Sequence, residues 1–303
     1  MMEFAVTILC GVVIGIAEII PGVSGGTLAV LLNIYDKLIG SISRLTKNLK
    51  KNLLFLAPLV LGMGIGIFAF SFVISFLLEH FPMAVNFFFL GLVIGIIPML
   101  LRRALETPFK GVSLVGFVAM FGVMVLLAVV SSQSGASTGA IEQLDLLLAV
   151  RLCLVGVLAA VCMILPGISG SMIMVIFGTY ETVVNAVKNL NILVLLPVGI
   201  GVLAGLLFGA KLVDFCLRRF PQFTYFAILG LVGGSAIPIF MKAGFTLSVA
   251  EGWVALLMFA AGVLVSLFFT SERMQNKGSK QELKENATEE QYFTVFDRIL
   301  LEI

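Results

Sequence analysis

The feature that most constrains this fold is a stretch that the chain contains twice. Residues 11–42 and 156–187 align without a gap at a constant offset of 145 residues. Each copy has Pro-Gly-x-Ser-Gly inside an apolar run, where a proline and two glycines interrupt a helix. The residues that we expect to break the helices are Pro21, Gly22, Pro166 and Gly167. The sequence therefore predicts two broken helices of one design.

Composition places these broken helices in a membrane protein. The chain of 303 residues is 60% hydrophobic and 12% charged, with a mean hydropathy of +1.15, whereas a soluble domain has about 25% charged residues. Its net charge of +2 is too small to indicate nucleic-acid binding. The chain has a single histidine, and its four cysteines lie in apolar runs without metal-ligand spacing. We therefore predict no metal site, no cofactor and no catalytic residue.

Hydropathy divides the chain into ten apolar segments that form two matching halves. The segments are 4–20, 22–42, 53–78, 84–101, 111–130, 146–165, 167–187, 192–216, 223–240 and 247–270. Beyond the opening motif the halves align at an offset of 139 residues, for example Gly62 with Gly201 and Gly91 with Gly230. We predict membrane repeats at 1–130 and 146–271, an external polar linker at 131–145, and a polar cytoplasmic tail at 272–303 that is disordered in part.

An odd number of crossings in each half makes the two halves insert with opposite orientation. The first two segments of each half either cross the bilayer or form a re-entrant hairpin, and both choices leave an odd number. We predict an all-α polytopic membrane protein with two inverted-topology repeats of five hydrophobic segments, each opening with a Pro-Gly-broken, re-entrant helix hairpin. Inverted repeats with broken helices near the midplane recur among transporters.

Basic residues orient this arrangement in the membrane. Loops on the side of the N-terminus contain ten of them, whereas loops on the other side contain only Lys188 and Lys242. The ten are Lys37, Arg44, Lys47, Lys50, Lys51, Arg102, Arg103, Lys110, Arg218 and Arg219. Because cytoplasmic loops carry the excess of Lys and Arg, both termini are predicted to be cytoplasmic.

The broken helices provide a candidate site for an anion. A helix break exposes backbone N–H groups that lipid cannot satisfy, so the break must face protein or a polar cavity. Free N–H groups, a helix dipole and hydroxyl groups together suit phosphate or carboxylate. The residues that we expect to bind substrate are Ser24, Gly25, Gly26, Thr27, Ser169, Gly170 and Ser171. The alternative is that Pro-Gly only kinks two helices for packing.

Two charges inside apolar runs are further candidates, since intramembrane charges are costly and usually functional. Glu18 precedes Pro21 by three residues, and its equivalent in the second half is Met163. Its carboxylate could carry a proton or bind a cation. Arg151 is the only arginine within an apolar run. Its guanidinium could bind phosphate oxygens in a fork, or it could extend to the external interface.

Other polar residues have simpler interpretations. Lys211 and Asp214 lie three residues apart, and we expect them to neutralise each other. The arginine pairs 102–103 and 218–219 close segments at the predicted cytoplasmic face, where they serve as anchors or attract an anionic head group. The chain has no P-loop for ATP, so we expect passive or ion-coupled transport. Polar residues that follow the motifs and could line the cavity are Asn33, Tyr35, Tyr180 and Glu181.

The stretches AEIIPGVSGGTLAVLLNIYDKLI and ILPGISGSMIMVIFGTYETVV resemble the bacterial PopT-type polyprenyl-phosphate transporters. The resemblance covers about residues 1–271. It implies a flippase of the bacterial cytoplasmic membrane that returns undecaprenyl phosphate, the carrier lipid of cell-wall polysaccharides, from the outer to the cytoplasmic leaflet. The matching positions are Glu18, Pro21, Gly22, Ser24, Gly25, Gly26, Thr27, Pro166, Gly167, Ser169 and Gly170.

Two alternatives use the same motifs. GIAEIIPGVSGGTL and ILPGISGS also resemble the motif regions of the bacterial undecaprenyl-pyrophosphate phosphatases. Those enzymes have an arginine directly after the turn serine and a pair of glutamates on the first motif helix, whereas this chain has Gly25 and Gly170 after its turn serines and, in the first motif, Glu18 without a nearby acidic partner. We therefore expect a transporter rather than an enzyme. A secondary transporter of a small water-soluble anion needs only the same site. The sequence leaves the oligomeric state open.

Overall fold

The computed structural model describes residues 2–19, 23–106, 108–133, 145–243 and 249–270. Pro21, Gly22, most of the predicted linker and the predicted tail lie outside these residues. The described part consists of twelve α-helices and contains no strand. This confirms the all-α prediction.

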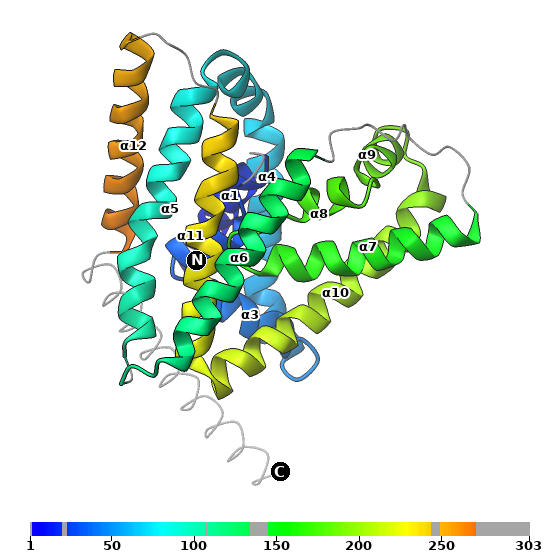
Figure 1. The fold of residues 1–303 in the computed structure, drawn as a ribbon. Helices are drawn as coiled ribbons and strands as arrows, with labels where there is room; N and C mark the ends of the chain where they lie inside the picture. The colour runs from blue at the N-terminus through cyan, green and yellow to red at the C-terminus, as the bar shows by residue number, and fades with distance from the viewer. Residues whose placement is uncertain (1, 20–22, 107, 134–144, 244–248, 271–303) are drawn as a thin grey trace.

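The helices fall into two sets of six, one in each predicted half (Figure 1). The first set is α1 (Met2–Ile19), α2 (Gly25–Leu31), α3 (Tyr35–Ser43), α4 (Leu49–His80), α5 (Pro82–Ala104) and α6 (Val112–Gln133). The second set is α7 (Leu146–Ile164), α8 (Gly170–Ile176), α9 (Tyr180–Lys188), α10 (Ile192–Arg219), α11 (Pro221–Lys242) and α12 (Val249–Thr270).

Seven of these helices are long and apolar enough to cross a membrane, which makes the chain a multi-pass membrane protein. They are α4, α5, α6, α7, α10, α11 and α12. α1 is apolar but shorter. Most of their surface carries exposed aliphatic and aromatic side chains, as expected for helices that face lipid.

Each of the predicted apolar segments 22–42 and 167–187 contains a break that the sequence analysis did not predict. Each consists of two short helices joined at a residue with positive φ, Asn33 at 60° and Gly178 at 62°. The next amide bonds back five residues, Ile34 N–H to Ala29 O and Thr179 N–H to Met174 O. This is the Schellman ending, which favours Gly or Asn at that position. α8 and α9 consequently meet at a bend of 119°.

Helix pairing follows the repeat. α1 packs along α4, and its equivalent α7 packs along α10. α5 packs on α12 and α11 packs on α6, while α5 and α11 contact each other at the centre. In Figure 1, α5, α11 and α12 stand side by side, and α7 and α10 cross the molecule as a pair. These contacts bury one large apolar cluster that includes residues of α1–α5, α7, α10 and α11.

Glycines bring the paired helices into backbone contact. A Cβ on Gly62 of α4 would overlap the backbone of Ile8 in α1, and a Cβ on Gly66 would overlap that of Val12. Since both positions advance by four residues, α1 and α4 run in the same direction. The equivalent contacts in the second half are those of Gly201 with Cys153 and of Gly205 with Val157. Each broken segment thus starts alongside the long helix that follows it.

Candidate site at the two broken helices

The first turn carries a carboxylate at the start of α2. Ser24 has extended backbone angles (φ −106°, ψ 131°), and α2 begins at the next residue. The first amides of a helix have no acceptor within the helix. Here the N–H of Gly25 donates to Oε1 of Glu18 at 3.0 Å. Glu18 therefore supplies, from within the chain, a side-chain acceptor for the first amide of α2.

The second turn has the same backbone plan without the carboxylate. α7 ends at Ile164, and α8 begins at Gly170 after an extended Ser169 (φ −94°, ψ 134°). Gly167 lies between them with φ +97°, and a Cβ there would contact the backbone of Leu231 in α11. Pro166 and Gly167 thus lie between two helices. Met163 occupies the position equivalent to Glu18, so no acidic side chain occurs at that repeat position.

Hydroxyl groups gather at both turns. Ser24 and Thr27 are each 2% exposed, and their side-chain oxygens have no hydrogen-bond partner in the described part of the chain. At the second turn the Oγ atoms of Ser169 and Ser171 lie 2.8 Å apart. Buried hydroxyls normally have a partner. The turns therefore retain donor and acceptor capacity for a ligand.

The two turns meet in the interior of the protein. A Cβ on Gly26 would lie 3.3 Å from the N and Cα atoms of Pro166, so only a small residue allows this approach. The Tyr35 hydroxyl donates to the carbonyl oxygen of Ile164 at 3.2 Å, and Tyr35 is 3% exposed. These contacts bring together the hydroxyl-bearing turns of the two halves.

Arg151 lies apart from these turn residues. Its Nη2 donates to the carbonyl oxygen of Phe177 at 2.5 Å, and its side chain is exposed. Phe177 caps the C-terminal end of α8, the end opposite Ser169. The structure therefore does not bring Arg151 to the two helix N-termini, and its role in binding stays a prediction.

A polar network that the sequence interpretation missed joins α3, α5 and α11. Arg103 donates from Nη1 to Asp36 Oδ2 at 2.7 Å and to the Tyr225 hydroxyl at 3.2 Å, and from Nη2 to the side-chain oxygen of Asn33. The Tyr225 hydroxyl also donates to Asp36 Oδ2 at 3.2 Å. Arg103 is therefore more than a membrane anchor. A sequence signal did exist, because Asp36 and Arg103 have Glu181 and Lys242 at the equivalent repeat positions.

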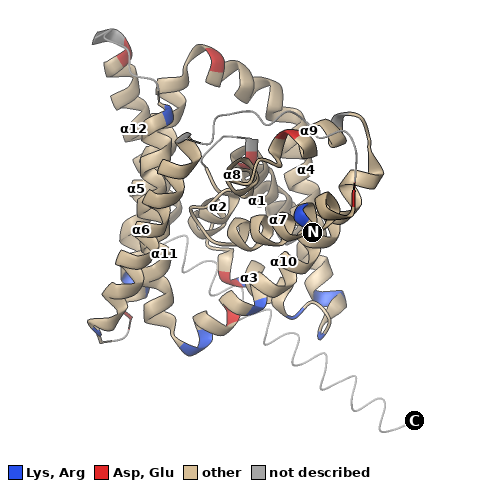
Figure 2. Cartoon of the chain, turned by 45° about the vertical axis from the view of Figure 1, so that its right-hand side comes forward, with Lys and Arg blue, Asp and Glu red and all other residues tan. Residues whose placement is uncertain are grey.

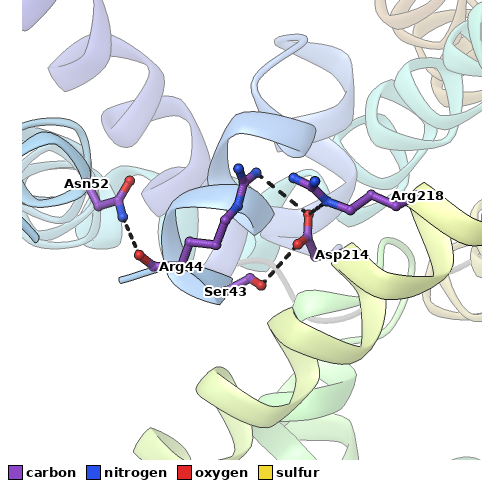
Figure 3. A network of polar contacts seen from close by, with 5 residues as sticks. All are labelled: Ser43, Arg44, Asn52, Asp214 and Arg218. Atoms are coloured by element: carbon purple, nitrogen blue, oxygen red, sulfur yellow. Dashed lines mark hydrogen bonds and ion pairs between the residues drawn. The ribbon is translucent and has the colours of Figure 1, made fainter. Parts of the chain in front are cut away.

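A second network joins α3 to α10 (Figure 3). Asp214 accepts from Arg218 Nε at 3.0 Å and from the Ser43 hydroxyl at 3.2 Å, and Arg44 lies 3.8 Å from it. The prediction that Asp214 and Lys211 neutralise each other was wrong, because Asp214 forms ion pairs with Arg44 and Arg218 instead. Ser43 and Arg44 are too distant in sequence for helical spacing to reveal this contact.

Both networks lie at the end of the molecule that carries most of the positive charge. Figure 2 shows Lys and Arg concentrated around α3 and the nearby ends of α6, α10 and α11. Acidic residues are more frequent at the opposite end (Figure 2). The two ends of the protein thus differ in charge, and the Asp36 and Asp214 networks belong to the basic end.

Comparison with known proteins gives consistent matches. Residues 14–252 match the model of the VCA0040-like family, described as undecaprenyl phosphate translocase-like. A polyprenyl-phosphate transporter of Staphylococcus aureus (strain NCTC 8325 / PS 47) is 33% identical over 271 residues, which cover 86% of this chain and 94% of the relative. A polyprenyl-phosphate transporter of Vibrio cholerae serotype O1 is 30% identical over 250 residues, 77% of each chain. No solved structure matches.

Proposed function

The chain belongs to the VCA0040-like family of undecaprenyl phosphate translocase-like proteins, and on that premise we propose that it carries undecaprenyl phosphate from the outer to the inner leaflet of the bacterial cytoplasmic membrane. The observation that carries this proposal is the similarity to the Staphylococcus aureus polyprenyl-phosphate transporter over 94% of that protein. The paired turns supply a physical reason, because they place polar groups inside a protein that is otherwise apolar.

Helix pairing supports two inverted repeats in this transporter. The main contacts of α1, α5 and α6 have counterparts made by α7, α11 and α12. α1 runs parallel to α4, and α3 ends at Ser43, just before α4 begins at Leu49. The segment from α1 to α3 therefore returns to the side from which it started. This supports the re-entrant interpretation of the opening hairpin, and it gives each half an odd number of crossings.

The charge distribution supports the orientation of the protein. The basic end, which contains α3 and the C-terminal end of α10, faces the cytoplasm in this proposal. α9 and the N-terminal end of α10 then lie on the external side. A lipid phosphate that enters from the outer leaflet reaches the paired turns from the α9 side and leaves past α3.

The proposed phosphate site consists of the hydroxyls and amides of the two turns. Ser24, Thr27, Ser169 and Ser171 can donate O–H groups to phosphate oxygens, and the start of α8 adds backbone N–H groups. Glu18 already occupies the Gly25 amide, so the phosphate sits closer to the second turn. Such a site lowers the barrier to moving a charged head group across about 30 Å of hydrocarbon while the tail stays in lipid.

Glu18 is the candidate for proton coupling. An anionic substrate beside the Glu18 carboxylate is repelled unless the carboxyl group takes up a proton, since like charges a few Å apart disfavour ionisation. Binding of the phosphate would then coincide with protonation of Glu18, and release would coincide with its deprotonation. This links movement of the lipid to the proton gradient.

The motif residues favour transport of the lipid phosphate over its hydrolysis. The positions after Ser24 and Ser169 are Gly25 and Gly170, where the similar phosphatases have an arginine. A guanidinium at that place would stabilise the charge on a phosphate that is being transferred. Without it, and with Glu18 as the single acid of the motif, the turns are suited to binding rather than cleavage.

The test uses purified protein in proteoliposomes. Transbilayer movement of undecaprenyl phosphate and release of phosphate from undecaprenyl pyrophosphate are measured on the same preparation. We expect lipid movement above that of protein-free liposomes and no phosphate release. Phosphate release would replace the proposal with the phosphatase function. If neither activity occurs and uptake of inorganic phosphate does, the chain is a transporter of a small anion.

A further inference from the structure

The largest helix contact that lacks a repeat counterpart is made by the third helix of the first half. α3 packs on the cytoplasmic end of α10, whereas the repeat equivalent of that contact, α9 against α4, has no comparable counterpart among the described residues. The α3–α10 contact includes the Asp214 network with Ser43 and Arg44 (Figure 3). The repeat equivalents of Asp214 and Arg218 on α4 are Ser75 and Glu79, and both are exposed.

The same asymmetry occurs in an acid–base pair that both halves contain. Asp36 of α3 pairs with Arg103 at the end of α5, 2.7 Å apart. The repeat equivalents are Glu181 of α9 and Lys242 at the end of α11, so the signs of the charges are kept. In the described part of the chain Glu181 and Lys242 form no ion pair, and Glu181 is exposed. Thus Asp36 and Arg103 form an ion pair, whereas the side chains of Glu181 and Lys242 are apart.

A third residue beside each acid–base pair also has a repeat equivalent. Tyr225, which bonds to both Asp36 and Arg103, has Asn86 as its repeat equivalent on α5. Asn86 already lies beside Lys242, since its side-chain amide donates to the Lys242 carbonyl oxygen at 3.4 Å. Lys242 and Asn86 are thus in place at the external side, whereas α9 with Glu181 lies apart. Asn33, the other partner of Arg103, has Gly178 as its equivalent, so the external pair lacks that one hydrogen bond.

We propose that the two acid–base pairs are alternating gates: Asp36–Arg103 closes the cytoplasmic side in this structure, and Glu181–Lys242 closes the external side in the opposite conformation. This rests on the inverted-repeat transport proposed above. In inverted repeats the second conformation arises when the halves exchange their contacts. α9 then packs on α4 as α3 now packs on α10. Asp36, Arg103 and Asp214 act as positioning residues, because they hold α3 and make no contact with the turn hydroxyls.

Disulfide cross-linking measures both gates without reference to the substrate. In a background in which Cys10, Cys153, Cys162 and Cys216 are replaced by alanine, one variant carries Ser43→Cys with Asp214→Cys, and another carries Glu181→Cys with Lys242→Cys. We expect the first pair to cross-link rapidly under mild oxidation, and the oxidised variant to transport much more slowly than the same variant after reduction. We expect the second pair to cross-link slowly, since its helices are apart in this conformation.

Opening the cytoplasmic gate should speed the external cross-link. Adding Asp36→Asn to the Glu181→Cys, Lys242→Cys variant removes the negative charge of the ion pair with Arg103 and leaves only a hydrogen bond to a neutral amide. We expect the cross-linking rate to rise about tenfold. Lys211→Met is the matched control on the basic end, since Lys211 makes no contact in either network, and it should leave the rate unchanged. The gate proposal would be wrong if Asp36→Asn left the rate of cross-linking between positions 181 and 242 unchanged. It would also be wrong if the cross-linked Ser43→Cys, Asp214→Cys variant transported normally.

The two proposals fail in different ways. If weakening the cytoplasmic pair speeds the external cross-link and undecaprenyl phosphate does not move, the gate proposal is supported and the proposed substrate is wrong. If undecaprenyl phosphate moves and the external cross-link never forms faster than in the parent protein, the proposed substrate stands and the gates are wrong. Thermal unfolding of each purified variant verifies that the compared proteins are folded.

Discussion

Met163→Glu should give the second turn the carboxylate that only the first turn has. Met163 is the repeat equivalent of Glu18, and its Cβ lies 3.6 Å from the point that a Cβ on Gly170 would occupy. A glutamate there can reach the Gly170 amide as Glu18 reaches the Gly25 amide. The new carboxylate then competes with the substrate phosphate for the start of α8, so transport should fall.

The size of the effect follows from the distance between the charges. Two unit charges about 4 Å apart repel by about 4 kcal/mol at an effective dielectric constant near 20. The carboxyl group escapes part of this repulsion by binding a proton, so the loss is smallest at low pH and grows as the pH rises and the group ionises. We expect at least a tenfold loss of transport at pH 8 and a smaller loss at pH 6, a tenfold change being about 1.4 kcal/mol.

Initial rates of undecaprenyl phosphate movement in proteoliposomes at these two pH values test the prediction. Met163→Gln is the control, because it has the same length and hydrogen-bonding reach without the charge. The glutamate variant should be slower than the glutamine variant, with a difference that increases with pH. Equal rates for the two variants at pH 8, with both proteins folded, would refute the placement of the phosphate at the second turn.

Three further substitutions test other parts of the account. Glu18→Gln keeps an acceptor for the Gly25 amide, so expression and thermal stability should be retained while turnover falls at least tenfold; unchanged turnover would sink the proton-coupling role. Tyr35→Phe leaves the Ile164 carbonyl oxygen without its donor and should lower the free energy of unfolding by about 1–3 kcal/mol, measured by denaturant titration in detergent. Gly62→Ala places a methyl group on the α1 backbone and should cost about 1–3 kcal/mol, whereas Gly64→Ala, with open space around it, should cost nothing.

The repeat made much of the fold predictable. Pro-Gly-x-Ser-Gly in an apolar run predicts a broken helix because proline and glycine disfavour helical backbone. The offsets of 145 and 139 residues identify α7 as the repeat equivalent of α1 and α11 as that of α5. The second break in each segment was not predicted. Asn33 and Gly178 occupy equivalent positions and favour positive φ, so a search for paired residues of this kind would have found the ends of α2 and α8.

Side-chain partners were less predictable than helices. Glu18 was identified as a candidate from its charge, but its contact with Gly25 depends on a turn that no helical spacing describes. Asp214 was assigned to Lys211 because of proximity in sequence, whereas its partners Arg44 and Ser43 come from α3 in the other half. Such contacts depend on how helices from distant parts of the chain pack. Local periodicity contains no information about that packing.

The most direct test of the central claim is the rate of undecaprenyl phosphate movement when the turn hydroxyls are removed. The measurement compares wild-type protein with Ser24→Ala, Ser169→Ala and Ser171→Ala in proteoliposomes, with Ser132→Ala near the C-terminal end of α6 as the control. We predict rapid movement by the wild type and by the control, and a loss of at least tenfold in each turn variant, since a hydrogen bond to a charged group contributes about 1.5–3 kcal/mol. Full rates in all three turn variants would contradict binding at the turns, and no movement by the wild type would contradict the transport itself.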